Sequence, residues 1–160
     1  MATENKNLSH YNPEDIPEAK GLRFGLVVSE WNTQITKNLC SGANTTLRDC
    51  GVNEEDIHRW DVPGSFELVY GCKKMIAKGG LDAIIAIGSV IRGETAHFDY
   101  VCSAVAQGIK DLNVIHEIPV IFCVLTDDTL QQAKDRSGGK HGNKGTEAAI
   151  AAIKMALLGK

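Results

Sequence analysis

Apolar positions along the chain alternate between two spacings, and this alternation predicts an α/β domain. Runs rich in apolar residues and of strand length occupy residues 22–29, 81–91 and 120–125, and a further strand is predicted over 57–62. Between these runs, apolar residues recur at every third or fourth position, which is the spacing of one helix face. Strands separated by helices, with connections long enough for right-handed crossovers, predict a four-stranded parallel sheet covered by helices on both faces.

Glycine and proline mark where the predicted elements end. Pro63-Gly64 stops the second strand, and Gly79-Gly80 ends the second helix. Helical patterns cover residues 35–47, 66–76 and 101–112, followed by a short helix over 129–136, a glycine-rich link over 137–145 and a last helix over 146–158. Residues 1–20 are polar and carry Pro13 and Pro17, so we expect a flexible arm able to pair with a neighbouring subunit, and a single domain over 21–160.

Composition excludes several function classes. A chain of 160 residues, 43% of them apolar, is long enough for one domain with its own core. A net charge of −3 argues against a nucleic-acid partner. No apolar run reaches the length of a membrane span, and the polar start is unlike a signal peptide, so we expect a cytoplasmic protein. The five cysteines are scattered without a C-x-x-C pair, which favours buried reduced thiols over disulfides or a metal site.

The segment Ala86–Tyr100 carries the strongest functional signal. A buried strand ends at a polar turn that contains Gly93, Thr95 and His97, and a helical pattern follows at once. In open α/β sheets, ligands bind outside the carboxyl ends of strands, where helix N-termini point free N–H groups at anions. The segment therefore predicts hydrogen-bonding groups for a ligand, an anion-binding helix N-terminus and a histidine able to exchange protons with the ligand.

Polar or aromatic residues also follow the first two strands, at Trp31, Ser65 and Glu67. Plainer interpretations of the candidate residues are that Trp31 covers the core, that Glu67 complements a helix dipole and that His97 is an ordinary helix-start residue. The glycine-rich link, Gly138–Gly145, lacks the spacing of a nucleotide phosphate loop.

Five motifs in order make the chain, from Gly25 onward, resemble the lumazine synthase family of riboflavin biosynthesis. They are Val28–Asn32, Val62–Glu67, Gly88–Tyr100, Pro119–Phe122 and Gly142–Gly145. The resemblance implies a flavodoxin-like three-layer α/β/α sandwich. It also implies the condensation of 5-amino-6-(D-ribitylamino)uracil with 3,4-dihydroxy-2-butanone 4-phosphate, without a metal or another cofactor.

The same resemblance implies a role for each matching residue. His97 matches the proton donor, and Trp31 stands where the family more often has a phenylalanine that stacks on the pyrimidine. The implied substrate-binding residues are Ser65, Phe66 and Glu67 for the ribityl chain, Ser89, Val90 and Ile91 for the pyrimidine, Glu94, Thr95 and Arg136 for the phosphate, and Phe122 and Lys144 beside them.

The resemblance further implies a homo-oligomer with active sites between subunits, because Phe122, Arg136 and Lys144 match residues that reach in from the adjacent subunit. Family members form pentamers, and many form icosahedral shells of sixty subunits that enclose riboflavin synthase in some cases. The short link over 137–145 favours the shell. A non-catalytic flavin-binding or storage protein on the same fold is the alternative, and His97 with the phosphate site argues against it.

Overall fold

The computed structural model describes residue 7 and residues 9–159, and its centre is one parallel sheet. Its strands lie in the order β2-β1-β3-β4. The bounds are Phe24–Ser29 for β1, Ile57–Val62 for β2, Ala83–Ile91 for β3 and Val120–Asp127 for β4. The predicted four-stranded parallel sheet is confirmed, and the bounds of β2 match the sequence prediction to the residue.

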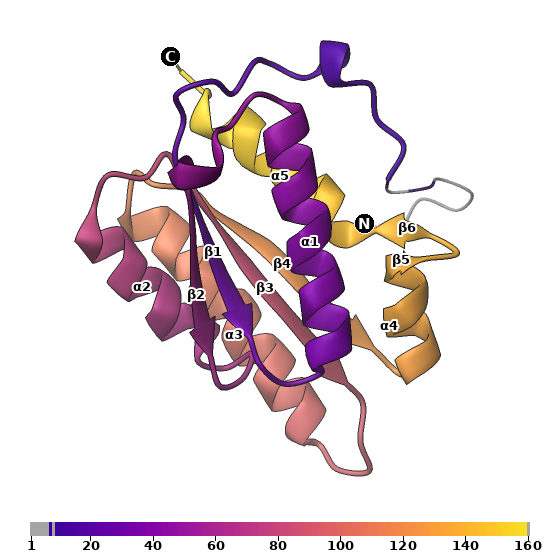
Figure 1. Ribbon diagram of the computed structural model, residues 1–160. Coiled ribbons are helices and arrows are strands. Elements are labelled where there is room, and N and C mark those ends of the chain that lie inside the picture. Colours follow the sequence, from indigo (N-terminus) through magenta and orange to yellow (C-terminus); the bar gives the residue numbers. More distant parts are fainter. Residues whose placement is uncertain (1–6, 8, 160) are drawn as a thin grey trace.

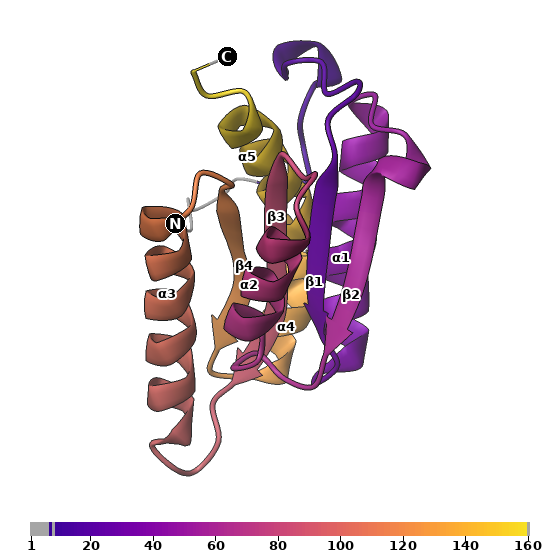
Figure 2. The same cartoon turned by 90° about the vertical axis from the view of Figure 1, so that its left-hand side faces the viewer.

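Helices cover both faces of the sheet (Figures 1 and 2). On one face lie α1 (Thr33–Asp49), α4 (Leu130–Arg136) and α5 (Lys144–Ala156), and on the other lie α2 (Leu68–Lys78) and α3 (His97–Ile115). Each face has its own apolar core, with Leu39 and Ile153 in the first and Leu68 and Val105 in the second. The three-layer sandwich expected from the sequence is therefore present.

The central strands explain why the sequence pattern was so clear. Every residue of β1 is buried, as is every residue of β3 from Ala83 to Ser89. A parallel strand covered on both faces reads as a continuous apolar run because neither of its faces meets water. The outer strand β2 alternates between half-buried and exposed residues, as an edge strand does.

The glycine-rich link over 137–145 differs from its prediction. It forms a small antiparallel ladder of β5 (Ser137–Gly139) and β6 (Gly142–Asn143), and α5 begins two residues earlier than expected. Gly138 and Gly142 have φ angles of 112° and 82°, a region that glycine enters without a steric cost. The chain reverses its direction between β5 and β6 through these glycine conformations. The presence of glycines in the sequence does not by itself predict such a reversal.

The start of the second helix also differs. We expected Phe66 to be the first apolar residue of its buried face, but α2 begins at Leu68 and Phe66 lies before it, 59% exposed. Glu67 is the residue that precedes the helix, and its side chain makes no capping hydrogen bond. Neither residue is engaged in the core, so both remain available at the surface.

Part of the predicted N-terminal arm lies outside the described residues, namely residues 1–6 and Leu8. Within the described part, a 3-10 turn forms over Pro13–Asp15. Ile16 and Ala19 are buried against the α1 and α5 face, and the Ala19 N–H donates to the Cys50 carbonyl oxygen at 2.9 Å. Pairing of this arm with a neighbouring subunit stays a prediction.

Four of the five cysteines are buried, and Cys102 is half-buried. Burial raises the pKa of the Cys72 and Cys123 thiols to about 12. In the part of the chain that the structure describes, no helix combines the length and the apolar character needed to cross a membrane.

Candidate functional site

The candidate site lies where the direction of the sheet order reverses. In the sheet, β2 lies on one side of β1 and β3 lies on the other. The connection from β1 to α1 and the connection from β3 to α3 therefore lead to opposite faces of the sheet and leave a space between them. A cleft of about 660 Å³ lies at these carboxyl ends. Its lining comes from the ends of β1, β2 and β3 and from the start of α3: Trp31, Asn32, Gly64, Ser65, Phe66, Glu67, Ser89, Val90, Ile91, His97 and Val101.

Asn32 ties the two sides of this reversal together. Its φ and ψ are 56° and 46°, the left-handed conformation, and it is the one residue other than glycine with positive φ in the described chain. Asparagine tolerates this conformation better than most residues. The sharp turn directs its Nδ2 to the Ser89 carbonyl oxygen at 2.9 Å, so the β1–α1 corner is fixed against the end of β3.

Two large aromatic side chains line the cleft yet remain open to solvent. Trp31 is 73% exposed and Phe66 is 59% exposed. Exposed aromatic rings gathered in a cleft are typical of sites that hold a planar or apolar ligand, because the core gains nothing from them. The sequence interpretation in which Trp31 only covers the core does not fit this exposure.

Two buried serine hydroxyls belong to the floor of the cleft. The Oγ atoms of Ser65 and Ser89 have no hydrogen-bond partner among the described residues, although the residues are only 6% and 2% exposed. A buried hydroxyl without a partner is costly, and such groups commonly mark the place of a ligand. Gly88 makes room for the Ser65 hydroxyl, since a Cβ at Gly88 would lie 2.7 Å from the Ser65 Oγ.

Glu67 and Gly64 shape the opposite wall. A Cβ on Gly64 would lie 2.9 Å from the Glu67 Oε2 and 3.5 Å from the Trp31 Cδ1. The Glu67 carboxylate and the Trp31 ring therefore both lie close to Gly64. This brings an acceptor of hydrogen bonds and a flat aromatic face to the same end of the cleft.

His97 is the first residue of α3, and its side chain is exposed at the cleft. Its N–H lies 3.4 Å from the Thr95 Oγ1. Glu94 and Thr95 are exposed in the connection between β3 and α3, beside the cleft but outside its lining. The residue before α3, Ala96, has no capping side chain, and its carbonyl oxygen accepts from the Asp99 N–H at 3.0 Å. The positive end of the helix dipole therefore faces this connection, where it favours an anion.

The remaining predicted residues, Phe122, Arg136 and Lys144, are not part of the cleft lining. Phe122 lies on the edge strand β4 and is 39% exposed. Arg136 ends α4 with its Nε 3.8 Å from the Asp127 Oδ1, and Lys144 begins α5 with its Nζ 2.6 Å from the Glu147 Oε1. The structure thus separates these three residues from the eight predicted residues that line the cleft.

Asp127 is a buried acid beside this second group. Burial raises the pKa of its carboxyl, and the Arg136 guanidinium opposes that effect. Its Oδ2 has no hydrogen-bond partner in the described chain. Asp127 was not among the predicted site residues, because it stands two residues beyond the apolar run over 120–125.

Asn32, Gly64 and Val101 also line the cleft without having been chosen as site residues. Asn32 directly follows Trp31 at the end of a strand, and asparagine at such a corner is a recognisable signal for a left-handed turn. A second cavity, of about 670 Å³, lies between α1 and the β5–β6 ladder, and it contains none of the predicted site residues.

Comparison with known proteins assigns a family to this arrangement. The family model for 6,7-dimethyl-8-ribityllumazine synthase matches residues 21–160. Proteins named 6,7-dimethyl-8-ribityllumazine synthase from Flavobacterium johnsoniae and Christiangramia forsetii are 66% and 65% identical to this chain. The matches cover 99% and 100% of the chain, and 83% and 96% of those proteins. A protein of the same name from Parabacteroides distasonis is 53% identical over 97% of each chain.

Proposed function

The chain belongs to the 6,7-dimethyl-8-ribityllumazine synthase family, and we propose from this premise how its residues divide the work of the reaction. The enzyme is a transferase of riboflavin biosynthesis. It condenses 5-amino-6-(D-ribitylamino)uracil with 3,4-dihydroxy-2-butanone 4-phosphate, and it releases phosphate and water as the second ring closes.

The uracil substrate occupies the cleft. Trp31 stacks on the pyrimidine, and the residues at the end of β3 (Ser89, Val90 and Ile91) bind its polar edge. Ser65, Phe66 and Glu67 bind the ribityl chain, whose hydroxyl groups match the Glu67 carboxylate and the two unpartnered serine hydroxyls. The exposed aromatic rings and these hydroxyls support this assignment.

The phosphate of the second substrate binds at the start of α3. Glu94 and Thr95 form the connection before the helix, and the positive end of the α3 dipole favours a dianion. We assign the remaining positive charge to Arg136 of an adjacent subunit, together with Phe122 over the ring and Lys144 near the phosphate. These interactions strengthen as charge grows on the departing phosphate, which is where they accelerate the reaction.

His97 moves protons. An amine attacks a ketone without help from a protein nucleophile, so the protein's contributions are alignment and proton transfer. Holding two substrates in a reactive geometry contributes up to about 7–11 kcal/mol. A positioned acid or base contributes about 10²–10⁴-fold. His97 is the histidine that lines the cleft, and it serves imine formation, loss of phosphate and ring closure.

A single observation carries the proposal that the site forms between subunits: Phe122, Arg136 and Lys144 stand apart from the cleft lining of their own chain. If both groups act on one pair of substrates, a second copy must supply one of them. A pentameric ring satisfies this requirement, since a head-to-tail interface places the α4 and β4 side of one copy against the cleft of the next. We further propose assembly of such pentamers into a sixty-subunit shell.

Mixed assemblies test the shared site. His97→Ala and Arg136→Ala subunits, each inactive or weakly active alone, are combined by co-expression. A site between subunits regains wild-type composition in about one quarter of positions, because partners in a head-to-tail ring are drawn at random. The expected result is activity near one quarter of wild type. A site contained within one subunit gives no recovery, and that result would overturn the proposal.

Two further measurements address the individual roles. Formation of the lumazine, followed by its fluorescence, gives kcat and the KM of each substrate; His97→Ala lowers kcat and leaves both KM values nearly unchanged. Sedimentation of the wild-type protein distinguishes a pentamer from a shell.

We propose a cytoplasmic location and riboflavin synthase as a partner enclosed by the shell. Cell fractionation and co-sedimentation of riboflavin synthase activity with the shell test both.

A further inference from the structure

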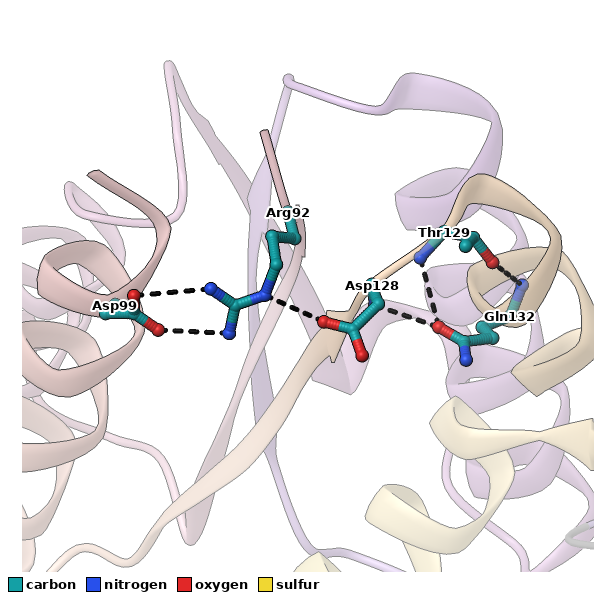
Figure 3. Close-up of polar contacts among 5 residues, drawn as sticks. All are labelled: Arg92, Asp99, Asp128, Thr129 and Gln132. Atoms are coloured by element: carbon teal, nitrogen blue, oxygen red, sulfur yellow. Dashed lines mark hydrogen bonds and ion pairs between the residues drawn. The ribbon is translucent and has the colours of Figure 1, made fainter. Parts of the chain in front are cut away.

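We propose that Arg92 is a positioning residue that holds His97 in place, and that it is not a ligand of the substrate phosphate. The inference rests on the proposed role of His97. Arg92 lies between the cleft residues of β3 and the phosphate connection, and neither group includes it. Three contacts of its guanidinium carry the argument, and Figure 3 shows the two with Asp99 and Asp128.

The backbone of Arg92 extends the sheet by one step. β3 ends at Ile91, which is paired with Asp127 in the ladder, and the Arg92 N–H donates to the Asp127 carbonyl oxygen at 2.9 Å. The base of the side chain is thereby fixed to β4. After this point the chain leaves the sheet, and residues 93–97 are exposed.

The side chain then reaches across this connection to the first turn of α3. Its Nη1 and Nη2 donate to the two carboxylate oxygens of Asp99 at 3.2 and 3.0 Å. The Arg92 Cζ lies 4.1 Å from the centre of the Phe98 ring. Asp99 and Phe98 directly follow His97, so the two contacts fix the helix turn from which the histidine projects.

This link adds to a weak cap, since the Thr95 Oγ1 accepts from the His97 N–H only at 3.4 Å. The residue before α3, Ala96, has no side chain that accepts a hydrogen bond from the helix N-terminus. Without a cap, the first turn of a helix is poorly fixed. A planar, two-pronged pair between arginine and aspartate supplies orientation that a single point charge does not.

The third contact runs to the other side. The Arg92 Nε donates to the Asp128 Oδ1 at 2.8 Å. The Asp128 N–H in turn donates to the Gln132 Oε1, which belongs to the capping box of α4, as Figure 3 shows. All three guanidinium nitrogens therefore face carboxylates of the same chain. Three of the five guanidinium N–H groups are engaged in this way, and two carboxylates against one cation leave Arg92 no net positive charge to offer a phosphate.

Kinetics of the assembled enzyme separate positioning from binding. Arg92→Ala is expected to lower kcat about 10-fold, since small displacements of a reacting group cost that much or more, with the KM of the butanone phosphate changed less than about 2-fold. Arg92→Lys keeps the charge but not the two-pronged geometry, and it is expected to recover little of the loss. A rise in that KM at unchanged kcat would make Arg92 a phosphate ligand.

A double-mutant cycle tests whether the effect passes through His97. In a His97→Ala background, Arg92→Ala is expected to change kcat less than about 2-fold. An undiminished 10-fold loss in that background would overturn the inference. If His97→Ala alone has wild-type kcat, the proposed role of His97 fails instead, and the two failures are thus distinguished.

Two controls complete the test. Arg48 forms an exposed ion pair with Glu54 at 3.3 Å, outside the cleft lining, so Arg48→Ala is expected to leave kcat unchanged. Should Arg92→Ala fail to fold, Asp99→Asn removes the same link and takes its place in the cycle. Exposed ion pairs add little to stability, so a fall in kcat without a fall in Tm is the expected signature.

Discussion

Gly145→Ala is expected to destabilise the protein strongly, although helix propensity alone predicts the opposite. Gly145 lies in the first turn of α5, where α5 meets α1. Alanine is favoured over glycine in a helix by about 0.5–1 kcal/mol. However, a Cβ at Gly145 would lie 1.9 Å from the Leu39 carbonyl oxygen, and ordinary contact begins at 3.4 Å.

The missing space of about 1.5 Å has to come from the backbone of one helix, because the atom in the way is itself backbone. Such a shift would disturb Asn143, whose Oδ1 accepts from the Gly145 N–H at 2.8 Å and whose Nδ2 donates to the Asn38 carbonyl oxygen at 2.9 Å. Overpacking of a core typically costs about 1–3 kcal/mol. A backbone clash belongs at the upper end, so we expect a net loss of about 2–3 kcal/mol.

Thermal unfolding measures this loss. For a domain of this size, 1 kcal/mol corresponds to about 2–4 °C in Tm, so Gly145→Ala should lower Tm by about 4–12 °C at fixed protein concentration. Gly93→Ala is the matched control, because its Cβ would meet nothing within 4 Å. A Tm for Gly145→Ala equal to or above that of wild type would refute the steric argument and leave helix propensity as the larger effect.

Three other predictions concern side chains away from this junction. Arg136→Ala should raise the KM of the butanone phosphate about 10-fold or more, since a hydrogen bond to a charged group contributes about 1.5–3 kcal/mol; an unchanged KM would remove Arg136 from the phosphate site. At pH 8, a thiol reagent should leave Cys72 and Cys123 unlabelled until the protein unfolds, because burial raises the pKa of both to about 12; labelling before unfolding would contradict their burial. The raised pKa of Asp127 means that its stabilising contribution is present below its ordinary value of 3.8 and is lost as the pH rises through the raised value. The Tm of Asp127→Asn relative to that of wild type should therefore be higher at pH 7 than at pH 4. An equal Tm difference at both pH values would argue against a raised pKa of Asp127.

The sheet could be predicted from the sequence because burial on both faces leaves a continuous apolar run. Residues 24–29 and 83–91 were recognisable for this reason, whereas the edge strand over 57–62 was delimited by Pro63-Gly64. The β5–β6 ladder could not be predicted, since two or three residues on each side provide no periodicity and the glycines that permit it also suit a loop. Phe66 was misplaced because an apolar residue at helical spacing is ordinarily buried.

The cleft could be predicted for a different reason. In a parallel sheet all strands end at the same edge, so polar and aromatic residues after separate strands must meet there, as Trp31, Ser65 and Ser89 do. Asn32 was missed because its contribution depends on a left-handed backbone that directs its amide to Ser89. The contacts of Arg92 could not be predicted either, since they join residues from three separate segments of the chain.

The strand order also has a consequence for how the protein folds. Phe24 pairs with Ile57 on one side and with Ala83 on the other, and Ile84 pairs with Val120, so no neighbouring pair in the main sheet is joined by a short hairpin. Sheets built only from distant pairings form slowly, because the entropy of closing long loops is lost before any contact is gained. During that delay the apolar run of β3 is exposed to other chains. Since the cleft needs β1 and β3 side by side, binding of the uracil substrate becomes possible only after this slow closure.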